Sequence, residues 1–213
     1  IDTAGNSYII GSTWSGVTSI AGQTVQQYGK GDIWLAKLKP DGSVDWVMTV
    51  GGNEQDYPTG IKCSANGDVY ITGLFQGYFQ YGNTGISGSS QGWSVFLLKL
   101  KSDGTPYFCR RIATADGANA WQSAGGDVEI DRFGNVYVSG SFTNTIQSGS
   151  GVIVAGSSQN DQNGFIMKVL PTNGTPIWAK QMGATASGLA VDEQGFVYVG
   201  GKMKAGADTF GTQ

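Results

Sequence analysis

The sequence repeats one short pattern four times, and this repetition strongly restricts the folds that the chain can adopt. Each copy contains a turn glycine that is followed after three residues by a tyrosine. The copies are IDTAGNSYIIG at 1–11, CSANGDVYITG at 63–73, IDRFGNVYVSG at 130–140 and VDEQGFVYVGG at 191–201. Their turn glycines lie about 61 to 67 residues apart. A regular repeat of this length indicates that one supersecondary unit is used four times.

Two β-hairpins account for most of each unit. In the second unit, Asn66-Gly67 separates TGIKCSA from DVYITG, and Asp103-Gly104 separates WSVFLLKLK from TPYFCRRI. Asn-Gly and Asp-Gly between apolar strands predict type I′ turns, in which both central residues have positive φ. We expect strands at about 68–73, 93–100, 105–112 and 124–131, with longer loops between the two hairpins. No segment has the apolar period of a helix, so the sequence predicts an all-β fold.

Four antiparallel strands in each repeated unit predict the blades of a β-propeller. A β-sandwich also has many short strands, but it does not repeat its sequence, and a β-helix repeats in shorter rungs without tight hairpins. In one propeller domain, we expect a partial blade (strands b to d) at 1–50, complete blades at 51–112 and 113–182, and strands a and b of another at 183–213. About three and a half blades do not close a ring. We therefore expect either the remainder of a longer chain or a second copy to close it.

Two parts of the sequence resemble a known repeat family. GDIWLAKLKPDGSVDWVMTVGG, followed by IKCSANGDVYITG, resembles the SBBP (β-propeller) repeats of bacterial secreted and cell-surface proteins. NGTPIWAKQMG and LAVDEQGFVYVGGKMKAGADTFGT are similar to the versions common in Bacteroidota. The resemblance implies a propeller and an extracellular or surface-attached bacterial protein. It implies no particular activity, because structure defines this family.

The composition excludes several functions for this segment. Its net charge of −3 provides no basic surface for nucleic acid, and no apolar stretch is long enough to span a membrane. The sequence contains no histidine, which excludes Ser-His-Asp and Cys-His nucleophilic sites and histidine metal sites. We therefore expect no catalytic residue, cofactor or metal site here.

Several residues recur once in each unit, and we interpret them as structural. The aromatic positions are Tyr8, Tyr70, Tyr137 and Tyr198; Trp34, Phe96 and Phe165; and Trp46, Phe108 and Trp178. They are expected to pack within and between blades. Lys37, Lys99 and Lys168 also recur, and each is expected to pair with a nearby carboxylate or carbonyl. Cys63 and Cys109 fall on the first and last strands of one blade, too far apart for a disulfide, and are expected to be buried free thiols.

The connections between strands break the repeat, so we expect any recognition site there. The crossovers between blades and the loops between second and third strands emerge on one face. Aromatic rings beside polar groups suit a sugar ring or a polar peptide. The candidate binding residues are Trp14, Tyr28, Asp56, Tyr57, Tyr78, Tyr81, Asp116 and Trp121. Alternatively, Tyr57 and Trp121 only hold long loops against the blades.

We therefore expect a non-catalytic binding or architectural module of a bacterial secreted or cell-surface protein, recognising protein or glycan through the loop face. One alternative is part of a propeller lyase or hydrolase whose catalytic residues lie in other blades. Another is a sugar-binding lectin.

Overall fold

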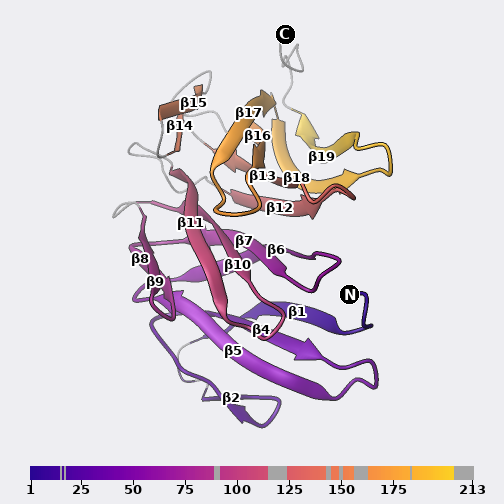
Figure 1. The fold of residues 1–213 in the computed structure, drawn as a ribbon. Helices are drawn as coiled ribbons and strands as arrows, with labels where there is room; N and C mark the ends of the chain where they lie inside the picture. The colour runs from indigo at the N-terminus through magenta and orange to yellow at the C-terminus, as the bar shows by residue number, and fades with distance from the viewer. Residues whose placement is uncertain are drawn as a thin grey trace.

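The computed structural model describes residues 1–14, 16, 18–88, 92–114, 124–142, 145–148, 151–155, 163–182 and 184–203. Every regular element in these ranges is a β-strand, which confirms the all-β prediction for them. The strands form antiparallel sheets that follow one another from the N-terminal to the C-terminal part of the chain (Figure 1).

Three larger sheets form the body of the molecule. The first has the order β1 (Ser7–Ser12), β4 (Ile33–Leu38), β5 (Val44–Gly52), β8 (Tyr78–Tyr81) and β9 (Thr84–Ser87). The second has the order β11 (Pro106–Thr114), β10 (Ser94–Leu100), β7 (Val69–Phe75) and β6 (Asp56–Cys63). The third has the order β12 (Ala124–Ile130), β13 (Val136–Phe142), β16 (Asn163–Val169) and β17 (Pro176–Met182). The predicted strand positions are therefore confirmed to within a few residues.

Three hairpins complete the described strands. They are β2 (Ser19–Ile20) with β3 (Gln23–Thr24), β14 (Thr145–Ser148) with β15 (Gly151–Ala155), and β18 (Ala184–Val191) with β19 (Val197–Met203). The first two, together with β8–β9, occupy connections that the sequence predicted as loops. The β8–β9 hairpin joins the preceding sheet, because Gly51 pairs with Gln80 and Gly52 with Phe79. It thereby covers part of the edge of β5, which would otherwise be open to pairing.

The tight turns have a different geometry from the predicted one. Gly67 has φ of 84°, but Asn66 before it does not have positive φ. The Ser64 amide donates to the Asp68 carbonyl (2.8 Å), and the Gly67 amide donates to the Ser64 carbonyl (2.9 Å). This pattern is a type I turn followed by a left-handed glycine in a three-residue hairpin loop. The type I′ prediction is wrong for this turn, because the extra loop residue leaves only the glycine in the left-handed region.

The second sheet is buried on both faces. On β10, Phe96 and Leu98 pack toward the first sheet, whereas Val95 and Leu97 pack toward the third. All of β10 is buried, which explains its nearly continuous apolar sequence. Phe79 of the inserted hairpin stacks on Phe96 with ring centroids 4.5 Å apart.

Two of the recurring lysines connect one sheet to the next. Lys37 Nζ lies 3.3 Å from the Asp45 carboxylate and donates to the Ser102 carbonyl of the second sheet (3.1 Å). Lys99 Nζ lies 2.9 Å from the Asp68 carboxylate and donates to the Pro171 carbonyl of the third sheet (3.3 Å). We call these two contacts the lysine bridges. They confirm the prediction of local pairing, and they also reach the neighbouring sheet.

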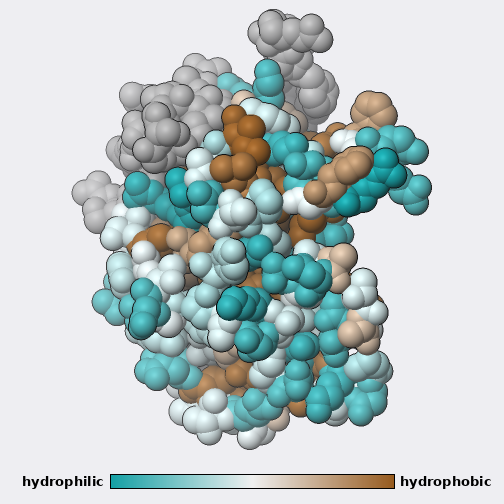
Figure 2. Space-filling view, in the orientation of Figure 1, coloured by the Kyte–Doolittle hydropathy of each residue, from teal (hydrophilic) through white to brown (hydrophobic). Residues whose placement is uncertain are grey.

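The β18–β19 hairpin is covered on one face. Leu189, Val197 and Val199 pack against Ile166 and Met182 of the third sheet. On the other face, the Tyr198 residue is 57 % exposed, whereas Tyr70 at the equivalent position of β7 is 3 % exposed. Figure 2 shows strongly hydrophobic residues at the surface in this part of the molecule.

The two cysteines are free, as predicted. Cys63 lies on β6 and Cys109 on β11, the opposite edges of the second sheet. Both cysteine residues are only partly buried, so the expectation of buried thiols is met only in part. Burial nevertheless raises the pKa of the Cys109 thiol to about 12.

Candidate functional site

The predicted binding residues divide by their exposure. Trp14 and Tyr78 are strongly exposed, whereas Tyr28, Tyr57 and Tyr81 are half-buried. Asp116 and Trp121 lie outside the described residues. Among the described candidates, Trp14 and Tyr78 are therefore the two that present the most aromatic surface to a ligand.

Tyr57 and Tyr81 contact other parts of the protein. The Tyr57 ring packs against the Trp93 ring with centroids 5.4 Å apart. The Tyr81 hydroxyl donates to the Gly104 carbonyl at the turn end of the second sheet (2.9 Å). Tyr57 thus matches the alternative interpretation, in which an aromatic residue holds a connection against the sheet.

Asp56 is fully buried, so it does not offer a surface contact. Its carboxylate accepts a hydrogen bond from the Gly52 amide (2.7 Å), and its own amide donates to the Gly31 carbonyl (2.9 Å). These contacts fix the crossover between β5 and β6. The surface role assigned to Asp56 from the sequence therefore does not fit its position, because the crossover folds over this side chain.

A second buried aspartate holds the neighbouring loops. The Asp32 carboxylate accepts from the Tyr28 amide (2.9 Å), and the Asp32 carbonyl accepts from the Thr13 amide (2.7 Å). Since β8 also pairs with Gly52, the segments that carry Trp14, Tyr28 and Tyr78 all attach to one region. We call residues 13–14, 27–32, 51–56 and 77–79 the loop cluster.

The side chain of Gln27 holds the backbone around Trp14. Its amide nitrogen donates to the Trp14 carbonyl (2.8 Å), and its amide oxygen accepts from the Gly16 amide (2.6 Å). The exposed indole therefore lies on a segment whose backbone is bound to a second loop. Such preorganisation reduces the entropy lost when a ligand binds.

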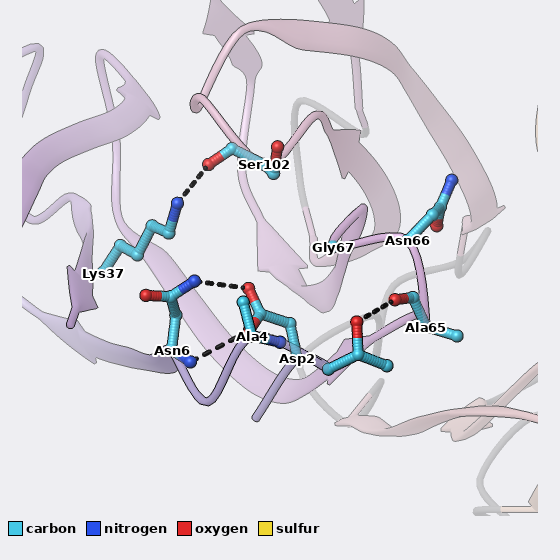
Figure 3. Close-up of a pocket in the computed structure, with 9 residues that line it drawn as sticks. Asp2, Ala4, Asn6, Lys37, Ala65, Asn66, Gly67 and Ser102 are labelled. Carbon is cyan, nitrogen blue, oxygen red and sulfur yellow. Dashed lines mark hydrogen bonds between the residues drawn. The ribbon is translucent and has the colours of Figure 1, made fainter. Parts of the chain in front are cut away.

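A polar pocket lies at the opposite end of the sheets, between the first and second sheets (Figure 3). Its volume is about 220 Å³, and its lining includes Asp2, Asn6, Lys37, Asn66 and Ser102. The Asp2 carboxylate already accepts from Asn6, and Lys37 already donates to the Ser102 carbonyl. Because its charged groups already have hydrogen-bond partners in the protein, this pocket is a weaker candidate for ligand recognition than the loop cluster.

The sequence reasoning missed a carboxylate that closes the first turn of most units. Asp131 accepts from the amides of Phe133 (2.9 Å) and Asn135 (2.8 Å) and from the Tyr137 hydroxyl (3.2 Å). Asp2 and Asp192 make the corresponding contacts in their units. The signal was an aspartate three residues before the turn glycine. In the second unit Ser64 replaces it, and the Tyr70 hydroxyl donates to the Pro171 carbonyl instead (3.2 Å).

A scan against protein-family models finds no match for this chain, and a search of curated proteins finds none either. The resemblance to SBBP repeats therefore stays a prediction from the sequence. In the described part of the chain, no helix is long and apolar enough to cross a membrane.

Proposed function

We propose that this chain is a non-catalytic binding module built on β-propeller blades, and that its loop cluster recognises a glycan. The observation that carries the proposal is the pair of exposed aromatic residues on a rigid support. Trp14 is 66 % exposed and Tyr78 is 47 % exposed, while their loops attach to buried aspartates. Exposed aromatic anchors with polar neighbours are common centres of recognition.

The repeated residues support the division between scaffold and site. Phe96 and Phe165 are fully buried, and Lys37 and Lys99 form the lysine bridges. These residues are therefore occupied in holding the sheets together. Recognition is left to the connections, which differ from one unit to the next.

Contacts between the first strands of successive units support a propeller arrangement, in which those strands surround a central axis. Lys62 on β6 pairs with Glu129 on β12 (2.5 Å). The Leu189 amide on β18 donates to the Asp127 carboxylate on β12 (3.2 Å). The resemblance to SBBP repeats favours a bacterial secreted or cell-surface location. Completion of the ring, by the rest of a longer chain or by a second copy, belongs to the same proposal.

A glycan array tests the proposal directly. We expect the protein to bind at least one glycan, and Trp14→Ala or Tyr78→Ala to weaken this binding by about 2 kcal/mol, or about thirtyfold. Trp121→Ala tests a candidate binding residue that lies outside the described residues. Phe133→Ala is the matched control, because Phe133 is also exposed but lies in a turn at the opposite end of the sheets.

Thermal melts of all variants show whether the fold is retained. Unchanged glycan binding in the Trp14, Tyr78 and Trp121 variants would place the site outside the loop face. Binding to a purified surface protein but to no glycan would favour the alternative partner, a polar peptide surface.

A further inference from the structure

The β18–β19 hairpin is the last of the described sheets along the chain, and the outer edge of β19 is open (Figure 1). Among the described residues, β19 pairs only with β18. The equivalent strands β1, β7 and β13 each pair with the next strand of their own unit, namely β4, β10 and β16. An open edge presents backbone amide and carbonyl groups to which an added strand can pair. β19 therefore lacks the neighbour that its three counterparts have.

The three counterparts pair with their neighbours in one register. In each pair, a tyrosine lies opposite a lysine, and the glycine three residues after this tyrosine lies opposite an aromatic residue. The matched positions are Tyr8–Lys37 with Gly11–Trp34, Tyr70–Lys99 with Gly73–Phe96, and Tyr137–Lys168 with Gly140–Phe165. Each lysine Nζ lies 5.1 to 5.9 Å from the centroid of its tyrosine ring, where the cation is attracted to the ring. The neighbouring strand thus carries an aromatic residue three positions before a lysine, a pattern that we write as aromatic-x-x-Lys.

β19 contains the tyrosine and the glycine of this register, but not their partners. Tyr198 and Gly201 occupy the two positions. The Tyr198 residue is 57 % exposed, and no described lysine lies over its ring. At Gly73, an added Cβ atom would lie 2.8 Å from the Phe96 ring, whereas at Gly201 its three nearest neighbours are backbone atoms of β18. The β19 edge is therefore open to a strand with the pattern aromatic-x-x-Lys.

The recurring lysine of the third sheet also lacks the acceptor that completes a lysine bridge. Lys37 donates to the Ser102 carbonyl, and Lys99 donates to the Pro171 carbonyl. Each acceptor comes three residues after the recurring lysine of the following sheet. Lys168 has no such carbonyl partner among the described residues, because β18 and β19 are the only strands described after the third sheet. A hairpin added to β19 would bring a carbonyl to the equivalent position.

Trp178 adds an exposed ring to the same region. It is paired with Lys168 across β16 and β17, and it is 37 % exposed. The equivalent Trp46 of the first sheet is half-buried, and its indole donates to the Ser102 carbonyl (3.4 Å). The Trp178 indole has no hydrogen-bond partner in the described part of the chain. An added hairpin would therefore cover apolar surface as well as an open strand edge, which favours its binding.

We propose that the β19 edge binds one further hairpin of the repeat, whose first strand carries the pattern aromatic-x-x-Lys. This strand pairs antiparallel with β19, its lysine lies over the Tyr198 ring, and its aromatic ring lies over Gly201. The carbonyl three residues after this lysine accepts from Lys168 and Trp178.

A folded second copy of the chain has no such strand to contribute. The pattern occurs three times in the sequence, in β4, β10 and β16, and each of these strands is already paired along both edges. The proposal rests on the blade arrangement of the proposed function, but it does not depend on glycan binding.

Calorimetry and thermal melts with a synthetic peptide test the proposal. The probe is residues 31–52, GDIWLAKLKPDGSVDWVMTVGG, which supply Trp34, Lys37 and the Pro40 carbonyl in the required spacing. We expect one peptide to bind per chain and to raise the melting temperature by about 2–5 °C at saturation. Lys37→Glu in the peptide should weaken binding about tenfold or more. Lys39→Glu changes the charge equally and is the matched control, which should bind as the unmodified peptide does.

Variants and hydrogen exchange locate the bound peptide on the chain. Tyr198→Ala should weaken peptide binding about tenfold or more, whereas Phe196→Ala, which removes an exposed ring just before β19, should leave it unchanged. Hydrogen exchange on the unmodified chain requires no variant to fold. With peptide, the amides of β19 should exchange more slowly. Those of β1, whose outer edge is also open among the described residues, should not change.

Failure of the peptide to bind would overturn the proposal. So would equal weakening by Lys37→Glu and Lys39→Glu, or equal protection of β1 and β19. A dimer of the chain with protected β19 amides in the absence of peptide would assign the edge to a second copy and would also overturn it. Glycan binding is measured separately on the chain alone, so the two proposals can fail independently.

Discussion

The two ends of the sheets use aspartate in opposite ways. At the turn end, Asp2 and Asp131 accept several hydrogen bonds from their own turns. At the loop end, Asp32 and Asp56 are fully buried and each leaves one oxygen unpartnered. The side-chain hydrogen bond from Asn6 lowers the pKa of Asp2, whereas burial raises the pKa of Asp56. The carboxylates at the turn end thus stabilise their turns through hydrogen bonds. Where the connections meet, the charged form of a carboxylate destabilises the folded state, because it is buried.

The largest expected contrast between the two ends is in their response to pH. Because the pKa of Asp56 in the folded chain, about 8, lies above its unfolded value of about 4, the folded state holds a proton that the unfolded state releases. This contribution to stability is complete below about pH 4 and is lost as the pH rises toward 8. The free energy of unfolding should therefore fall by on the order of 3 kcal/mol between pH 5 and pH 8.

Because the sequence contains no histidine, no histidine titration contributes to the change in stability between pH 5 and pH 8. Urea unfolding at a series of pH values provides the measurement. Asp56→Asn should flatten the curve. A flat curve for the unmodified chain would remove the contrast between the two ends.

A smaller effect is expected from Asp131→Ala at the turn end. The substitution leaves the amides of Phe133 and Asn135 without their acceptor and should lower the free energy of unfolding by about 2 kcal/mol at pH 7. Asp131 has a lowered pKa, although burial acts against the hydrogen bonds that lower it. Its stabilisation is therefore present above about pH 4 and is lost under more acidic conditions. Urea unfolding at pH 7 and pH 3 should show the difference from the unmodified chain shrinking.

The smallest expected effect distinguishes a buried copy of the turn from an exposed one. Tyr137→Phe removes the hydroxyl that donates to Asp131 and should cost about 1 kcal/mol, because the pair is buried. Tyr198→Phe removes the same bond to Asp192 in a solvent-exposed turn, and it should cost clearly less. Thermal melts of the two variants provide the comparison. Equal losses would show that burial does not determine the strength of this bond.

The sequence predicts features that each unit contains within itself. The positions of β7, β10 and β11 follow from local alternation and turn residues, and Lys99 could be recognised by its recurrence. The turn type was mispredicted, because two-residue and three-residue loops both end in Asn-Gly or Asp-Gly. β8 belongs to the second unit in sequence, but it pairs with β5 of the first sheet. A local sequence pattern does not predict this pairing, because the pairing depends on contacts with a neighbouring sheet.

The candidate site was predicted only in part for the same reason. Aromatic residues in connections point correctly to Trp14 and Tyr78 as exposed groups. The burial of Asp56 depends on the meeting of two connections that are distant in sequence. Asp32 was missed, because a single aspartate before a strand is indistinguishable from an ordinary surface residue until its partners are known.

The lysine bridges determine where foreign sequence can be inserted. The turn at residues 101–105 supplies the Ser102 carbonyl to Lys37 and Trp46, so a peptide tag placed there would push the first two sheets apart. The turn at residues 39–43 is closed by its own hydrogen bonds, and an added Cβ at Gly42 would meet no neighbouring atom within 4 Å. A fluorophore or affinity peptide at residues 39–43 should therefore report on the folded chain without separating its sheets.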